Sequence, residues 1–234
     1  MTVANAQILE RLLDGGVVPI LRLKEPGPAI DLVEALCAGG INTFEIALGT
    51  PNALELIREV RTTFADRVVL GAGTVLDTET ARLAVTAGAQ FIVAPSLNLD
   101  LIRFAKRYSI VVVPGALTPT EILTAWEAGA DMVKVFPVRA LGPSYIKDVL
   151  APLPQVRLVP VGGVTVEDAA DYIRAGAVAV GLGGELLSKQ LIDERRYDEL
   201  QERARRVVAA IREARVGGTS PVPAGVSAPP VTPF

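Results

Sequence analysis

The strongest constraint on the fold is a set of eight short apolar runs, rich in β-branched residues, whose starts lie roughly 20–27 residues apart. The runs occupy residues 16–21, 43–48, 68–73, 91–96, 110–116, 132–137, 156–163 and 178–184. Segments with helical periodicity lie between them; for example, Ile30, Val33 and Cys37 fall on one helix face. Continuous apolar strands that alternate with helices predict a parallel sheet buried on both faces.

A second repeat supports a closed sheet. Gly39, Gly88, Gly129 and Gly176 each stand just before an even-numbered run, where we expect them to end a helix in the left-handed conformation. Eight strand–helix units in about 200 residues predict an α/β fold of the (β/α)8 TIM barrel type. The alternative is an open doubly wound sheet. Such sheets usually carry a glycine-rich dinucleotide loop after the first strand, and "PILRLKEPG" is not one.

The two ends of the chain are assigned separately. Residues 5–14 predict an extra N-terminal helix that closes the bottom of the barrel, and residues 194–215 predict the last helix. The Pro-, Gly- and Ser-rich tail at 217–234 has no apolar periodicity, so we expect it to be disordered. This gives a single barrel domain at 1–216 followed by the tail.

Composition excludes several classes of protein. The net charge of −3 and pI near 5.2 offer no basic footprint for nucleic acid. No apolar stretch reaches the roughly 18–20 residues that span a bilayer, and the N-terminus lacks signal-peptide features, so we expect a cytoplasmic protein without membrane partners. The single cysteine, Cys37, fits a reducing compartment. Histidine is absent, so catalysis would depend on lysine, carboxylates, hydroxyls and backbone groups.

Candidate site residues gather at the C-terminal ends of the predicted strands, where active sites of such barrels lie. They are Glu45, Thr74, Pro95, Ser96, Lys134, Phe136, Gly162, Gly163, Gly183, Gly184 and Glu185. The two glycine pairs follow the seventh and eighth strands, where backbone N–H groups bind phosphate in this fold, although simple tight turns would also use glycine.

Lys134 stands in the middle of a strand that reads as buried. An unpaired buried ammonium is costly, so the charge is paired, the strand lies at an edge, or the neutral amine is needed. Side chains alternate along a strand, which puts Met132, Lys134 and Phe136 on one face. Apolar walls around that face would lower the amine's pKa towards the neutral form that attacks carbonyls. The structural alternative is an ion pair with Glu45 that holds the barrel interior.

The ordered motifs "VVPIL", "FEIAL", "GAGTV", "VAPS", "VPGALTPTEI", "VKVFP", "VGGV" and "VGLGGELL" across residues 17–187 resemble the 2-keto-3-deoxy-6-phosphogluconate (KDPG) aldolases, also called 4-hydroxy-2-oxoglutarate (KHG) aldolases. The resemblance implies a homotrimeric (β/α)8 enzyme of class I that needs no metal or cofactor. Such enzymes split a small 2-keto-3-deoxy acid into pyruvate and an aldehyde.

The resemblance also implies residue roles. Lys134 matches the Schiff-base lysine and Glu45 the general acid/base. Thr74 matches a threonine near the pyruvate carboxylate, while Pro95 and Phe136 match residues that line the pocket.

Two positions depart from the family pattern. An arginine usually follows the glutamate strand, where this chain has Gly49, and a serine usually follows the last glycine pair, where it has Glu185. Unless Glu185 points away and caps the next helix, it repels phosphate, which predicts a weaker preference for phosphorylated substrates. The alternatives to an aldolase are a phosphosugar isomerase or synthase that uses Glu45 as base and Lys134 only as an electrostatic anchor, a non-catalytic phosphate-binding barrel, and a scaffold with a buried ion pair.

Overall fold

The structure is a computed structural model that describes residues 3–216, in which strands alternate with helices. The strands are β1 (Val17–Leu21), β2 (Thr43–Ala47), β3 (Val69–Gly73), β4 (Phe91–Val93), β5 (Val111–Val113), β6 (Gly115–Ala116), β7 (Val133–Val135), β8 (Leu158–Pro160) and β9 (Val180–Leu182). The helices are α1 (Val3–Gly15), α2 (Ala29–Ala38), α3 (Ala53–Phe64), α4 (Thr78–Ala87), α5 (Leu99–Arg107), α6 (Pro119–Glu127), α7 (Gly142–Leu150), α8 (Ala169–Arg174), α9 (Lys189–Asp193) and α10 (Tyr197–Val216), with a 3-10 turn at Ala65–Arg67.

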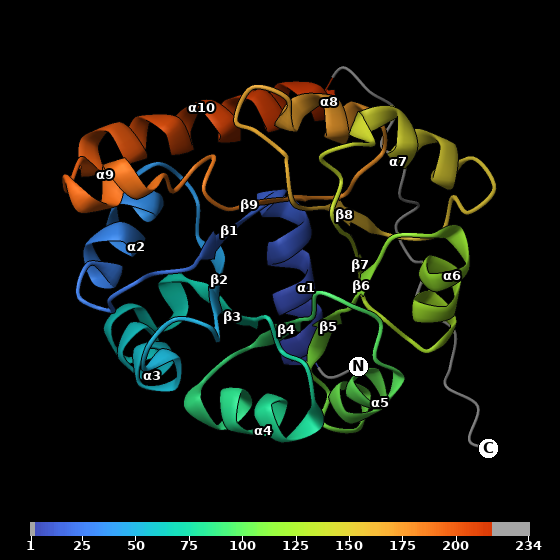
Figure 1. Cartoon of the computed structure of the whole chain (residues 1–234), viewed down its shortest axis with the longest axis horizontal. Coiled ribbons are helices and arrows are strands. Elements are labelled where there is room, and N and C mark those ends of the chain that lie inside the picture. Colours follow the sequence, from blue (N-terminus) through green and yellow to red (C-terminus); the bar gives the residue numbers. More distant parts are fainter. Residues whose placement is uncertain (1–2, 217–234) are drawn as a thin grey trace.

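All the paired strands are parallel, which confirms the predicted α/β architecture. One curled sheet has the order β5-β4-β3-β2-β1-β9, and a second has the order β6-β7-β8. A parallel bridge between Val161 and Gly181 links β8 to β9. Figure 1 shows the helices around the outside of the strands.

Each of the eight apolar runs contains a strand, and the fifth run contains two. Proline lacks the N–H that a ladder needs, and Pro114 separates β5 from β6. The chain passes through Pro114 from the end of the first sheet to the start of the second. Pro114 therefore interrupts the fifth run at the point where the chain leaves the first sheet and enters the second.

Helix α1 confirms the predicted N-terminal helix, with slightly wider bounds. Its Leu9 and Leu12 pack against Val18, Val69 and other apolar residues near the starts of the strands. In Figure 1 this helix lies in the middle of the view, surrounded by the strands. The opposite ends of the strands are left for a site.

Three of the four predicted helix-ending glycines have the left-handed conformation, with φ of 116°, 98° and 107°: Gly88, Gly129 and Gly176. Gly39 ends α2 as predicted, but its predicted left-handed conformation is wrong, because its φ is −82° and the left-handed residue is Gly40, with φ of 92°. Gly39 instead allows close packing of α2 against α10, since a Cβ there would lie 2.7 Å from the Gln201 carbonyl oxygen.

The last helix differs from its predicted bounds. Residues 194–215 were expected as one helix, but Arg195 adopts a φ of 52°, so a turn precedes α10 at Tyr197. The tail at 217–234, expected to be disordered, lies outside the described residues. None of the described helices is both long and apolar enough to cross a membrane.

Candidate active site

A cavity of about 780 Å³ opens at the C-terminal ends of the strands. Ten of the residues singled out from the sequence line it: Glu45, Thr74, Pro95, Lys134, Phe136, Gly162, Gly163, Gly183, Gly184 and Glu185. Ser96 is not among the described residues that line it. Positions up to 140 residues apart in the chain are thus brought together because parallel strands end at the same edge.

Lys134 lies at the centre of β7 and reaches the cavity although it is only 6% exposed. Met132 packs in the interior cluster, whereas Val133 and Val135 pack in the outer core, as strand alternation requires. The amine nitrogen Nζ lies 4.8 Å from the centroid of the Phe136 ring. Burial lowers the pKa of the Lys134 amine. The negative charge of Glu45 opposes this shift, and the positive charge of Arg22 adds to it.

Glu45 lies at the centre of β2, opposite Ile20 of β1 and Gly71 of β3, and is 3% exposed. Burial raises the pKa of its carboxyl, whereas the charges of Lys134 and Arg22 lower it. Glu45 and Lys134 line the same cavity, but they form no direct ion pair within the described part of the chain.

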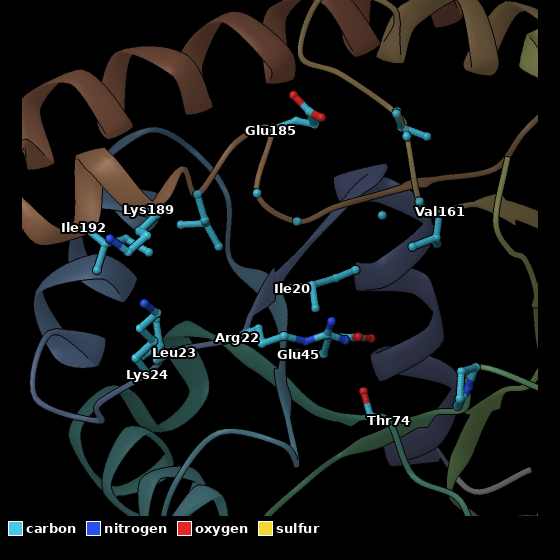
Figure 2. A pocket seen from close by; sticks show the side chains of 18 of the residues that line it. Ile20, Arg22, Leu23, Lys24, Glu45, Thr74, Val161, Glu185, Lys189 and Ile192 are labelled. Atoms are coloured by element: carbon cyan, nitrogen blue, oxygen red, sulfur yellow. The ribbon is translucent and has the colours of Figure 1, made fainter. Parts of the chain in front are cut away.

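Arg22 is a site residue that the motif comparison misses. It directly follows β1, lines the cavity, and in Figure 2 its side chain extends toward Glu45. Gly49, whose lack of a side chain suggested that a cation was lost, is not among the described residues that line the cavity. Arg22 supplies a guanidinium to the cavity from the strand next to β2, whereas position 49 supplies none. Its position at the end of an apolar run is the signal that could have identified it.

Thr74 adopts an unusual backbone conformation at the end of β3. Its φ of 61° lies in the left-handed region, which is a genuine outlier for a β-branched residue. Figure 2 shows its hydroxyl directed toward the side where Glu45 and Arg22 meet. Strained residues of this kind concentrate at sites of function.

The glycine pair after β8 is required by geometry. Gly162 and Gly163 have φ values of 82° and 111°. A Cβ on Gly162 would lie 2.8 Å from the Phe136 ring, and one on Gly163 would lie 2.6 Å from Cα of Arg139. By contrast, a Cβ on Gly183 or Gly184 would meet no atom within 4 Å, so that backbone borders open space.

Comparison with known proteins shows the family. The family model described as "KDPG and KHG aldolase" matches residues 8–203. This chain belongs to the KDPG and KHG aldolase family. It is 38% identical over 199 residues to the 2-dehydro-3-deoxy-6-phosphogalactonate aldolase of Escherichia coli K12, which covers 85% of this chain and 95% of that protein.

Solved structures of related aldolases have the same fold. The KDPG aldolase of Legionella pneumophila, with pyruvate captured as a covalent carbinolamine, is 28% identical and matches with a TM-score of 0.80 over 86% of this chain and 98% of that one. A protein cage designed by fusing symmetric oligomeric domains contains a chain that is 37% identical, with a TM-score of 0.79 over 86% of this chain and 74% of that one. Family membership makes this protein an aldolase, a lyase, rather than an isomerase, a binding barrel or a scaffold.

At Glu185 this KDPG and KHG aldolase departs from the family pattern. Its Oε1 lies 3.6 Å from Nη2 of Arg139, which belongs to the loop after β7, and both side chains are partly exposed. Figure 2 shows the Glu185 carboxylate pointing away from Glu45. It does not cap the following helix, because the Ser188 hydroxyl accepts the Leu191 N–H at the start of α9. The carboxylate at the outer edge of the cavity therefore has a cationic partner that the sequence pattern does not reveal.

Proposed function

We propose that Lys134 is the amine that forms a Schiff base with a 2-keto-3-deoxy acid, and that Glu45 moves protons as the substrate splits into pyruvate and an aldehyde. One observation carries the proposal: a buried lysine with a lowered pKa and a buried glutamate with a raised pKa line the same cavity. Ionisable groups whose pKa values are shifted by burial in a cavity are typical of acid–base sites.

The reaction follows from these two groups. The neutral amine attacks the C2 ketone to give a carbinolamine, and loss of water leaves an iminium that draws electrons from the C3–C4 bond. Glu45, directly or through one water, takes the proton of the C4 hydroxyl, so that C4 leaves as the aldehyde carbon and C3 becomes an enamine carbon. Glu45 then returns a proton to C3, and water hydrolyses the iminium to release pyruvate and the free amine.

Arg22 and Thr74 are suited to hold the substrate's carboxylate at C1. A guanidinium has several donors in a fixed plane, which matches a carboxylate, and a hydroxyl adds one more. Both side chains line the cavity beside Glu45 and reach it from neighbouring strand ends. In this position they would fix the C2 carbonyl near Lys134 without taking part in proton transfer.

The other end of the substrate would lie against the two glycine pairs. Their backbone N–H groups are suited to a phosphate, as are those of other barrels at the same position. Arg139 adds a cation there, but Glu185 already pairs with it. We therefore propose that the protein cleaves 2-keto-3-deoxy-6-phospho sugar acids with a weaker preference for phosphate than relatives with serine, and that it accepts 4-hydroxy-2-oxoglutarate or unphosphorylated acids.

A lysine exchange tests the role of Lys134. Lys134→Met keeps an unbranched side chain of similar length and removes the nucleophile, so cleavage should be abolished while the fold survives. Lys147→Met, on the exposed face of α7, is the matched control and should keep full activity. Substantial cleavage by Lys134→Met would exclude Lys134 as the imine-forming residue.

We also propose that the two sheets close into a single (β/α)8 barrel. Three features support closure: the Val161–Gly181 bridge, the hydrogen bond from the Val178 amide to the Leu158 carbonyl at 3.0 Å, and the direct passage of β5 into β6. Together they join both edges of the first sheet to the second.

The remaining proposals concern assembly and location. Three large apolar side chains are about half exposed: Leu76 in the loop before α4, Leu83 on α4 and Tyr108 directly after α5. Helix α4 packs against α5. They are suited to a subunit interface, and we propose a homotrimer, as the family resemblance implies. A cytoplasmic location fits the single cysteine and the acidic composition.

A further inference from the structure

Strand β3 carries two glycines on the face that points inward. Its outward residues Leu70 and Ala72 pack in the outer core, whereas Val69 packs in the interior cluster, so alternation places Gly71 and Gly73 on the interior side with Val69. Neither glycine has a positive φ, so backbone conformation does not require glycine at these positions. The reason for their presence is the space they leave.

The two glycines leave space for different neighbours. A Cβ on Gly71 would press against three atoms of the Phe91 ring, including Cδ2 at 2.7 Å. A Cβ on Gly73 would lie 2.7 Å from Cδ and 3.2 Å from Cγ of Glu45, and closer still to its Oε1. The carboxylate of Glu45 thus lies directly over the bare backbone of Gly73.

The backbone of Gly73 cannot easily retreat from an added methyl group. Its carbonyl accepts the Leu48 N–H at 2.9 Å, and it is paired in register with Ala47 of β2. Thr74, the next residue, has the left-handed conformation described above. The far end of the Glu45 side chain is the flexible partner in this contact, so the carboxylate would move and the strand would stay.

We propose that Gly73 is a positioning residue for proton transfer, because the absence of a side chain there sets where the Glu45 carboxylate sits. The proposal rests on the proposed role of Glu45 as the proton carrier. It assigns Gly73 no contact with substrate. Any β-carbon at this position would move the carboxylate away from C3 and the C4 hydroxyl of the substrate, the two groups with which it exchanges protons.

Gly73→Ala tests the proposal through two separate steps of the reaction. A displacement on the order of 1 Å at a catalytic group costs about 10²-fold, so solvent exchange of the pyruvate methyl protons should fall by about that factor. Imine formation at Lys134, measured by borohydride trapping with pyruvate, should still go to completion. The melting temperature should change little, because only a flexible chain end must adjust.

Gly71→Ala is the matched control on the same strand face. Its added methyl group meets the buried Phe91 ring instead of Glu45, so the variant should have a lower melting temperature. The rate of methyl-proton exchange, divided by the fraction of Lys134 that borohydride traps with pyruvate, should stay within about 2-fold of wild type. Should that variant fail to fold, Glu45→Ala provides the second comparison. Gly73→Ala added to Glu45→Ala should cause less than about a 2-fold further loss, because no carboxylate remains to be displaced.

The outcomes separate this inference from the function on which it rests. Wild-type exchange in Glu45→Gln would overturn the role of Glu45 itself. Loss of exchange in Glu45→Gln with wild-type exchange in Gly73→Ala would overturn only the positioning role. Equal losses from Gly73→Ala with and without Glu45 would mean that the methyl group acts on the strand and not on the carboxylate.

Discussion

Replacing Glu185 by serine should increase the preference of this enzyme for a phosphorylated substrate. The carboxylate stands beside the glycine pairs at the outer part of the cavity, and its Oε1 lies 3.6 Å from Arg139. The change removes a negative charge that would repel phosphate. It also releases Arg139 to act as a phosphate ligand.

The size of the effect follows from distance and exposure. Two unit charges about 6 Å apart at an effective dielectric near 20 interact with about 2–3 kcal/mol. The Glu185 side chain is 44% exposed and is partly neutralised by Arg139, and exposed pairs usually contribute no more than about 1 kcal/mol. We therefore expect a change of about 1 kcal/mol in transition-state binding, which corresponds to about 5-fold.

The assay compares kcat/KM for a 2-keto-3-deoxy-6-phospho acid and its unphosphorylated analogue. Glu185→Ser should raise the ratio about 5-fold, and Arg139→Met should lower it. In both variants only kcat/KM for the phosphorylated substrate should change. Glu55→Ser is the matched control, because it breaks a similarly exposed pair with Arg58 on α3, away from the cavity. If the ratio is unchanged in Glu185→Ser and also in Arg139→Met, the pair does not face the distal group and the reasoning is refuted.

Glu45→Gln keeps the size of the side chain and removes its basicity, so methyl-proton exchange in pyruvate should fall by about 10²–10⁴-fold, whereas exchange at the wild-type rate would place the base elsewhere. Lys134→Met should raise the melting temperature at neutral pH, because burial lowers the pKa of Lys134 and the folded state must hold an amine that is protonated when unfolded. That advantage should shrink as pH rises from the lowered pKa towards the unfolded value near 10.5, and an advantage that grows with pH would contradict it. Sedimentation should give three times the chain mass, and Leu83→Asp should reduce it; a monomeric wild type would refute the trimer.

Most of the fold could be predicted because its signals are local. Each apolar run predicts the strand that it contains, and the glycines at 88, 129 and 176 mark the ends of their helices. The wrong conformation predicted for Gly39 arose because a distant contact decides at that position. Gly39 has no local need for its missing side chain; it is required by α10, which approaches from the far end of the chain. The hydrophobic periodicity of a segment cannot predict a contact of this kind between segments far apart in the chain.

The site could be predicted as far as strand ends define it. The ten lining residues named from the sequence follow from one rule, that parallel strands present their C-terminal ends to one cavity. Arg22 was missed because the motif comparison considered a cation only at position 49, whereas this long side chain enters the cavity from the end of β1. Arg139 was missed because it lies in a loop, whose path is not encoded by an apolar pattern.

The central claim, that the buried amine of Lys134 forms an imine with a keto acid, is tested most directly by intact mass after borohydride reduction in the presence of pyruvate. The chain has only five lysines: Lys24, Lys106, Lys134, Lys147 and Lys189. We predict one reduced pyruvyl group per chain, mapped to Lys134, with Lys147→Met labelled normally and Lys134→Met unlabelled. An unlabelled wild type, or a label on any other lysine, would contradict the account.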